Sequence, residues 1–477
     1  MSGGLYLHAL RTATPRQLRG RALAPLRRRR FPARPRPPFR APTEPVELWR
    51  SAAFASQPLA GRGEERLRSF HSHYGEDVLT AARAGDPAAA LVAARGWIAG
   101  NLPLPGDAWH PYPTSTRVAN WIAAAALVPE LAGDDVLESL WRQLLHLAEN
   151  VEEDILGNHL IRNARALMLG GLAFGDPGLA RRGRELVRRE VAEQVLRDGG
   201  HYERSPVYHL VVLRDLLEIH ALAAAAVPAP VLEAMRHFAS ALARPDGAPA
   251  LFNDGGLELA PELELPRAVD GLAVFPDTGY AVLRRGPLWL AFDCGAPSPP
   301  YLPAHAHADA LSFQLWWRGR PVVVDPGTYT YEPGAVRDWF RGTEAHATVA
   351  LDGHDQFRLW GAFRSGPLPR VQLLEATAGR LRAAVEWPRA RHVRTIDIGN
   401  GDVTVTDELE GTGEHEVVSS LPLGGDGQGI RASGPLGASA ESRWVSERFF
   451  ERAPGSALVQ RGRLQLPATI GWTIRLQ

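Results

Sequence analysis

Histidine and aspartate gather in two nearby stretches of the chain, and these residue types suit a metal ion or a proton-transfer site. His305 and His307 lie two residues apart in AHAHAD, so an extended segment would project both to the same face. Asp325 ends the apolar run PVVVD, and His346 opens the run HATVALDG. Zinc accepts imidazole nitrogen and carboxylate oxygen. The spacing therefore indicates a metal site, with ordinary strand histidines as the alternative.

A second set of polar residues lies in the first half of the chain, where the pattern is helical. Asn158 and His159 open the segment NHLIRNARAL, and Tyr208 lies in DGGHYERSPVYHL. Taken singly these residues are ordinary, because an asparagine at a helix start is usually a cap and a tyrosine is usually an aromatic on a helix face. Two such clusters come from each half of the chain, and together they indicate a cleft between two domains.

The elements that must position these residues fall into regions of different periodicity. Residues 1–45 are rich in Arg and Pro and form a basic N-terminal arm. Over residues 46–268 apolar residues recur at helical spacing, as in DDVLESLWRQLLHLAENVEEDI, and short connections predict antiparallel helices. Over residues 269–477 the period is two, as in LSFQLWWRGRPVVVDPG. We therefore expect a helical domain followed by an antiparallel β domain of two packed sheets.

The composition excludes several chemistries. The chain has 53 basic and 53 acidic residues, so its net charge is zero and nothing global favours nucleic acid. It contains no lysine, which excludes a Schiff base and a P-loop. Its single cysteine, Cys294, excludes an intrachain disulfide and a cysteine zinc cage.

The sequence also bears on the cellular compartment of the protein. It has no apolar run of about 18 residues, so we expect no membrane span. The arm lacks the apolar core and cleavage site of a secretory signal, which predicts a cytoplasmic protein. The arm either lies over the folded body or forms a solvated tail.

Five segments, in the same order, make this chain resemble the heparinase II/III family of polysaccharide lyases. They are GNHLIRNARAL, DGGHYERSPVYH, HAHADALSF, VVVDPGTYTY and WFRGTEAHATVALDGHDQ. The resemblance implies an incomplete (α/α) toroid followed by an antiparallel β-sandwich, with the active site between them. It also implies β-elimination next to a uronic acid. Lyases of this family are often periplasmic or secreted, in contrast to the missing signal.

The resemblance implies roles for four residues. Asn158 and His159 would contact the uronate carboxylate and neutralise it, which allows an enolate-like intermediate, and His159 is also a candidate base. Tyr208 would protonate the leaving O4 oxygen, and in a syn elimination it would also take the C5 proton. His305 would assist charge neutralisation or proton transfer.

The resemblance also implies a zinc ion. His307, Asp325 and His346 match the zinc ligands of the family, and the metal would be chiefly structural, holding strands together beneath the cleft. Ala347 follows the third histidine where the family often has asparagine. That departure removes a polar group near the metal and leaves the ligands intact.

Five more residues are candidates for substrate binding: Trp109, Tyr112, Arg117, Glu203 and Arg341. Aromatic rings stack on sugars, and arginine binds carboxylates. The alternatives are that the aromatics of WHPYPTSTRVANWIA pack in the toroid core and that Arg341 braces the metal loop. Glu203 matches an acidic position of the family whose role is open.

We therefore expect a polysaccharide lyase that acts on an acidic, uronate-containing polysaccharide such as a glycosaminoglycan or an exopolysaccharide. A glycoside hydrolase is an alternative, although it needs two opposed carboxylates where these clusters supply mainly His, Asn and Tyr. A non-catalytic glycan-binding or exopolysaccharide-assembly protein with the same fold is another. The sequence leaves the particular substrate and the oligomeric state open.

Overall fold

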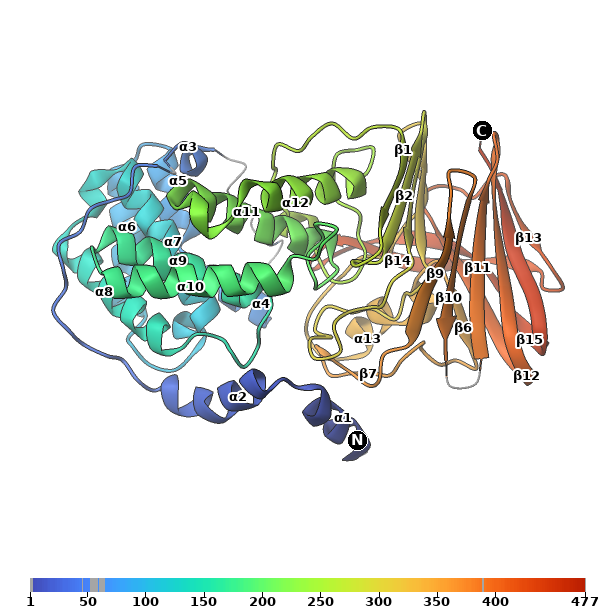
Figure 1. Cartoon of the computed structure of the whole chain (residues 1–477), viewed down its shortest axis with the longest axis horizontal. Helices are drawn as coiled ribbons and strands as arrows, with labels where there is room; N and C mark the ends of the chain where they lie inside the picture. Colours follow the sequence, from blue (N-terminus) through green and yellow to red (C-terminus); the bar gives the residue numbers. More distant parts are fainter. Residues whose placement is uncertain (1–2, 45, 52–58, 60–64, 388–389, 477) are drawn as a thin grey trace.

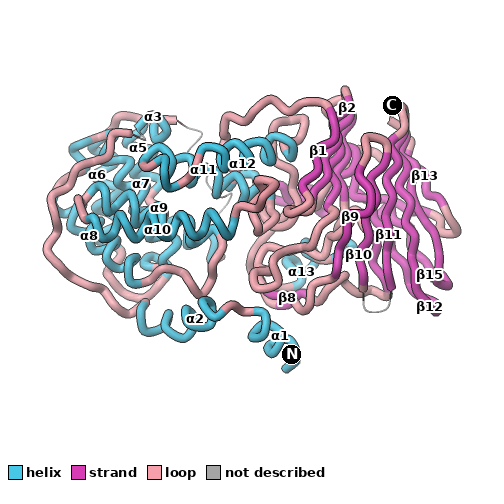
Figure 2. Tube along the Cα trace, in the orientation of Figure 1, coloured by secondary structure: helices cyan, strands magenta, loops and turns pink. Residues whose placement is uncertain are grey.

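The computed structural model describes residues 3–44, 46–51, 59, 65–387 and 390–476, and it has a helical half and a sheet half (Figures 1 and 2). The helices before the sheet are α1 (Gly3–Thr12), α2 (Pro15–Arg27), α3 (Val46–Arg50), α4 (Arg66–Ser72), α5 (Glu76–Arg83), α6 (Pro87–Gly100), α7 (Pro111–Leu127), α8 (Asp134–Glu149), α9 (Asn158–Ala173), α10 (Pro177–Gln194), α11 (Pro206–Leu222) and α12 (Ala229–Leu242). One further helix, α13 (Ala335–Arg341), lies between strands. No described helix is long and apolar enough to cross a membrane.

The interior helices of the helical half bring their first turns together. Helix α9 packs against α7, α10 and α11. Pro111 and Pro206 begin α7 and α11, a position that suits proline because its missing N–H has no partner to lose there. One apolar core joins α5 to α9 and a second joins α9 to α12. These cores hold the helices in register, so the N-terminal ends of α7, α9 and α11 meet at one site.

Thirteen strands of the sheet half form one antiparallel hydrogen-bonded network. The strands are β1 (Gly271–Phe275), β2 (Tyr280–Arg285), β3 (Leu288–Asp293), β4 (Phe313–Trp317), β5 (Arg320–Val323), β6 (Val349–Leu351), β9 (Arg370–Ala376), β10 (Arg380–Glu386), β11 (Ala390–Ile398), β12 (Asp402–Leu423), β13 (Ile430–Ser433), β14 (Ala438–Arg448) and β15 (Glu451–Arg475). A separate small hairpin consists of β7 (Leu359–Trp360) and β8 (Arg364–Ser365).

The network turns over itself to make two packed layers. Leu290 of β3 and Phe313 of β4 share one hydrophobic core with Ile396 of β11 and Trp472 of β15, although these strands are far apart along the path of the sheet. Residues alternate between the two faces of a strand, so only one face of each layer reaches this core. The predicted antiparallel β-sandwich is confirmed.

The connection between the two halves has little regular structure. Helix α12 ends at Leu242 and β1 begins at Gly271, and the predicted division near residue 268 falls between them. Within this connection Asn253 and Asp254 hydrogen-bond to the segment of the sheet half that carries the paired histidines. The two halves therefore share polar contacts directly at their junction.

The N-terminal arm lies on the body and touches both halves. Arg16 of α2 forms an ion pair with Glu190 of α10, with 2.7 Å between Nη2 and Oε1. The Tyr6 ring of α1 packs edge-on against Trp360 of β7, with 5.0 Å between ring centroids. Of the two arrangements that the sequence left open for the arm, the structure shows the one in which it covers the body (Figure 1).

Candidate active site

The helical side of the site consists of the first turns of three helices. Asn158 and His159 begin α9, Tyr112 lies in the first turn of α7, and Tyr208 lies in the first turn of α11. The Ser205 hydroxyl caps α11 by accepting a hydrogen bond from the backbone N–H of Tyr208 at 3.1 Å. Helix N-termini carry partial positive charge, so this arrangement suits a ligand with a negative group.

Glu203 holds Asn158 in place from the segment before α11. One carboxylate oxygen accepts from the Asn158 backbone N–H at 2.9 Å, and the other accepts from Nδ2 at 3.0 Å. Burial works to raise the pKa of Glu203, but His201 and His305 outweigh it and the pKa is lowered. Gly157, at φ 65°, allows this approach because a Cβ there would overlap Glu203. The buried Asn158 Oδ1 has no hydrogen-bond partner among the described residues and is available to a ligand.

His159 is paired with a buried carboxylate. Its Nδ1 lies 2.9 Å from Oε1 of Glu152, and its ring packs on Tyr112 with 4.3 Å between centroids. Burial opposes protonation of His159, but Glu152 outweighs it and the pKa of His159 is raised. Burial likewise opposes ionisation of Glu152, yet chiefly His159 lowers its pKa to about 2. The pair therefore favours an imidazolium beside an ionised carboxylate.

Tyr208 meets the sheet half through two rings. Its hydroxyl lies 2.9 Å from the hydroxyl of Tyr331, and its ring stacks on His305 with 4.1 Å between centroids. Burial raises the pKa of Tyr208 well above its ordinary value. Tyr208 therefore keeps its proton near neutral pH, which suits a group that donates a proton.

Asp254 is the hub of the junction, by which we mean the one carboxylate that binds His305, His307 and Arg337 together. It accepts from His305 Nδ1 at 3.1 Å, from His307 Nε2 at 2.9 Å and from Arg337 Nη2 at 2.6 Å. Burial works to raise the pKa of Asp254, but Arg337 and the two histidines outweigh it and lower the pKa far below the ordinary value. A carboxylate only accepts hydrogen bonds, so His305 is protonated on Nδ1 and leaves its Nε2 free for acid–base work. That Nε2 lies 3.9 Å from Glu203 Oε2.

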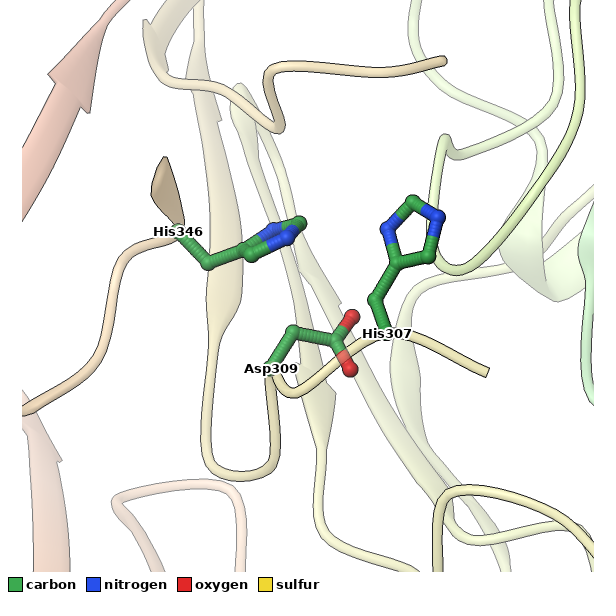
Figure 3. A group of neighbouring side chains, drawn as sticks. All are labelled: His307, Asp309 and His346. Atoms are coloured by element: carbon green, nitrogen blue, oxygen red, sulfur yellow. The ribbon is translucent and has the colours of Figure 1, made fainter. Parts of the chain in front are cut away.

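A candidate metal centre lies on the far side of this hub. One nitrogen or oxygen from each of His307, Asp309 and His346 lies within 4.8 Å of the others (Figure 3). His307 Nδ1 and both carboxylate oxygens of Asp309 are buried and have no hydrogen-bond partner among the described residues. Such unsatisfied atoms are costly without a ligand, so this group fits a cation. Burial raises the pKa of Asp309 to about 6.

Asp325 lies beside the same centre. Its Oδ2 is 3.0 Å from His346 Nδ1, while His346 Nε2 lies 3.1 Å from the carbonyl oxygen of Phe340. Ligand atoms bound to one zinc ion at about 2.0–2.1 Å lie about 3.0–3.5 Å apart in tetrahedral geometry. The spacing of Asp325 and His346 fits that pattern. Of the three predicted ligands, His307 and His346 lie in this cluster, whose carboxylate is Asp309, and Asp325 contacts the cluster through His346.

Two predicted substrate-binding residues lie instead in the core of the helical half. Trp109 is 4% exposed, and its indole N–H donates to the carbonyl of Asn101. Arg117 is fully buried; it donates to Gln143 Oε1 at 2.8 Å and lies over the Trp97 ring at 3.6 Å. These contacts favour the alternative that both residues pack in the toroid core.

Arg341 also has a structural role here. It is fully buried and donates to the carbonyl oxygens of Ala306 at 3.3 Å and Ala362 at 3.0 Å. It therefore braces the loop that carries the paired histidines. Of the remaining candidates, half-buried Tyr112 lies against His159, whereas buried Glu203 acts behind Asn158 and positions it.

Several residues of the site were not predicted from the sequence. Asp254 is followed by two glycines in FNDGG, and Tyr331 ends DPGTYTY, so both carried a weak signal. Asp309 lies in the histidine segment AHAHAD, where nothing in the spacing distinguishes it as a ligand. Glu152 in VEEDI and Arg337 on α13 resemble surface charges, and only the fold shows that they are buried.

Two domain models of one family match this chain. Residues 96–278 match the heparinase II/III N-terminus, and residues 268–445 match the heparinase II/III-like C-terminal domain. A heparin-sulfate lyase of Bacteroides stercoris is 24% identical over 374 residues, which are 66% of this chain and 54% of that protein. The FtsZ-localized protein C of Caulobacter vibrioides is 27% identical over 280 residues, which are 54% of this chain and 47% of that protein. The chain thus spans about half the length of these relatives.

Solved structures agree on the fold. A crystal structure of heparinase III superimposes with a TM-score of 0.71 at 14% identity, over 96% of this chain and 90% of that one. At this identity the likeness concerns the fold, and it confirms the predicted toroid followed by a sandwich. The two matched domains together cover most of the chain, with the candidate site at their junction. The chain belongs to the heparinase II/III family.

Proposed function

We propose that this protein is a polysaccharide lyase that cleaves beside a uronic acid by β-elimination. The observation that carries the proposal is the contact between Tyr208 of the helical half and His305 of the sheet half, with Asn158 and His159 on the adjoining helix start. The family relationship supports the reaction class, and relatives named heparin-sulfate lyases support an acidic glycan as substrate.

The first requirement of the reaction is to neutralise the substrate carboxylate. A C5 proton next to a charged carboxylate is too weakly acidic to remove, and a positive or hydrogen-bonding environment lowers that barrier. His159, kept protonated by Glu152, would supply the charge. Asn158 Oδ1 has no partner and would accept a hydrogen bond from the protonated form of the carboxyl group.

The second requirement is proton transfer at C5 and O4. The free Nε2 of His305 is a candidate base for the C5 proton, since Asp254 holds the proton on Nδ1. The Tyr208 hydroxyl, which keeps its proton at neutral pH, would protonate the O4 oxygen as it leaves. In this division His159 is a cation and does not act as the base.

We also propose that His307, Asp309, Asp325 and His346 hold a zinc ion. Two imidazoles and two carboxylates form a donor set that zinc accepts, and the unsatisfied atoms of His307 and Asp309 support it. When bound, the ion would tie together three loops that carry little regular structure. His307 also donates to Asp254, so the centre would fix the orientation of that hub and, through it, of His305.

A hydrolase fits these observations less well. The carboxylates nearest Tyr208 and His159 are Glu152, Glu203 and Asp254, and each is held by hydrogen bonds or ion pairs within the protein. A glycosidase needs one carboxyl group free to give a proton and another free to attack or to activate water.

The lyase reaction can be tested by absorbance near 232 nm, the band of the unsaturated uronate that elimination creates. We expect a rise with at least one polymer in a panel of uronate polysaccharides. Tyr208→Phe should lower the rate by roughly 10²–10⁴-fold, the usual range for loss of a general acid. Tyr280→Phe is the matched control, because it also removes a buried tyrosine hydroxyl, but one that donates to the backbone carbonyl of Arg204 and contacts neither Tyr331 nor His305.

Two results would contradict the proposal. New reducing ends without absorbance near 232 nm would indicate hydrolysis. Binding to a uronate polymer without any cleavage, unchanged in Tyr208→Phe, would indicate a non-catalytic glycan-binding protein.

A further inference from the structure

The outward faces of α1 and α2 carry exposed leucines. Leu18 and Leu26 lie eight residues apart on α2, which places them on one face of the helix, and they are 40% and 64% exposed. Leu7 and Leu10 lie on the outer side of α1 and are 48% and 57% exposed. The two helices run along one edge of the molecule (Figure 1).

Arginines flank these leucines. Arg19 and Arg21 lie on either side of the Leu18–Leu26 stripe, and Arg11 lies in the last turn of α1 beside Leu7 and Leu10. All three arginines are exposed, and none forms an ion pair with a described residue. The opposite face of α2 is occupied: Arg16 binds Glu190, and Gly20 packs closely on the backbone at Asp154. The leucine-and-arginine face therefore remains available while the arm is bound to the body.

Charge is distributed very unevenly between the arm and the body. Residues 1–45 hold 11 arginines and one acidic residue, Glu44, a net charge of +10. The whole chain is neutral, so the remaining residues carry a net charge of −10. An anionic surface would repel the body and attract the arm, which orients the molecule with α1 and α2 toward that surface.

We propose that the outward faces of α1 and α2 bind the surface of a membrane that contains anionic lipid. An amphipathic helix with leucine on its outer face and arginine beside it lies in the interface, with its apolar side chains among the acyl chains and its guanidinium groups at the phosphates. The leucines favour a lipid surface over an acidic polysaccharide, because a soluble polyanion has no apolar phase to receive them. The surface is peripheral and needs no spanning helix.

Vesicle co-sedimentation of the full chain tests this proposal. We expect binding to vesicles of phosphatidylcholine with 30% phosphatidylglycerol and little binding to phosphatidylcholine alone. Replacing Arg11, Arg19 and Arg21 together by Gln should weaken binding by roughly 100-fold, and replacing Leu7, Leu10, Leu18 and Leu26 together by Ser should weaken it by about tenfold or more. Both variants change exposed side chains and should melt at the temperature of the unmodified protein.

Matched controls replace exposed leucines and arginines outside the arm, so they test whether the location of these residues matters or only their number. Leu102 and Leu104 are as exposed as the arm leucines, at 67% and 62%, but lie in the loop after α6, and Arg182 and Arg188 are exposed on α10. Leu102→Ser with Leu104→Ser, and Arg182→Gln with Arg188→Gln, should bind vesicles normally.

Three results would overturn the proposal. Equal binding to neutral and anionic vesicles, or none to either, excludes an anionic lipid surface. Loss of binding in the arginine variant but not in the leucine variant would indicate general attraction to polyanions. A dimer that dissociates in the leucine variant would show that a second copy covers this face.

Discussion

The helical half and the sheet half present their site residues in different ways. Asn158, His159 and Tyr208 lie in the first turns of regular helices, where a capping hydroxyl and the helix itself set the backbone. His305 and Tyr331 lie in loops between strands, where no ladder of hydrogen bonds holds them. The sheet half compensates with a buried network around Asp254.

This difference shows how one site can combine local and non-local support. A helix start is specified by a few neighbouring residues, so its side chains keep their positions even if a distant contact is lost. A loop held by buried ion pairs depends on every partner, because one missing partner leaves the others unsatisfied. We therefore expect the sheet side to be the more fragile half of the site.

Asp254→Asn should have the largest effect, because it removes the charge that three donors share. Arg337 would then be a buried cation without its counter-ion, which costs about 3–5 kcal/mol of unfolding free energy. His305 would also lose the acceptor that sets its tautomer, so kcat should fall by roughly 10²-fold or more. Denaturant unfolding and initial rates measure the two effects. A variant with normal stability would show that the network does not hold the sheet side.

The second largest expected effect is a loss of stability in the sheet half when a metal ligand is removed. His346→Ala should lower both the zinc content, measured by elemental analysis, and the melting temperature, since bound metal stabilises the folded state. His209→Ala is the matched control, because it truncates another buried histidine, on α11 and outside the cluster. If the unmodified protein binds no metal, or if both variants lose the same amount, the four residues are not a zinc site.

Glu152→Gln probes the helical half with a smaller, pH-dependent effect. The pKa of His159 is raised by Glu152, so the imidazolium persists as pH rises until that raised pKa is passed. Without the carboxylate the imidazolium is lost at lower pH, and the alkaline limb of kcat/KM should move to lower pH. Rates below both pKa values should change little. An unchanged alkaline limb would contradict the assignment of His159 as the cation.

Arg117→Met should have the smallest effect on the reaction. Arg117 lies inside the helical half and donates to Gln143 and to backbone carbonyls, so its loss should cost about 1–3 kcal/mol of stability. KM should stay within about twofold, because no substrate contact is removed. A large rise in KM with unchanged stability would show that this residue does bind substrate.

The sequence predicted the elements of both halves well, because each reads as a regular period. The residues at helical spacing in the first half, such as Leu140, and the alternating apolar residues in the second half, such as Ile396, are the ones that the two hydrophobic cores bury. The family motifs also identified Tyr208 and His305, which the structure brings into contact. The aromatic segment around Trp109 was less clear, because an aromatic at helical spacing looks the same whether it faces a core or a cleft.

What the sequence determined by itself is what depends on near neighbours: the helix starts, the strand periods, the excluded chemistries and the charge of the arm. The tertiary structure decided which charges are buried and which of them meet. Asp254 and Arg337 are 83 residues apart, and nothing local to either one signals an ion pair. Burial and long-range pairing arise only when the chain folds, since the free energy of a charge depends on the water and partners that the fold leaves around it.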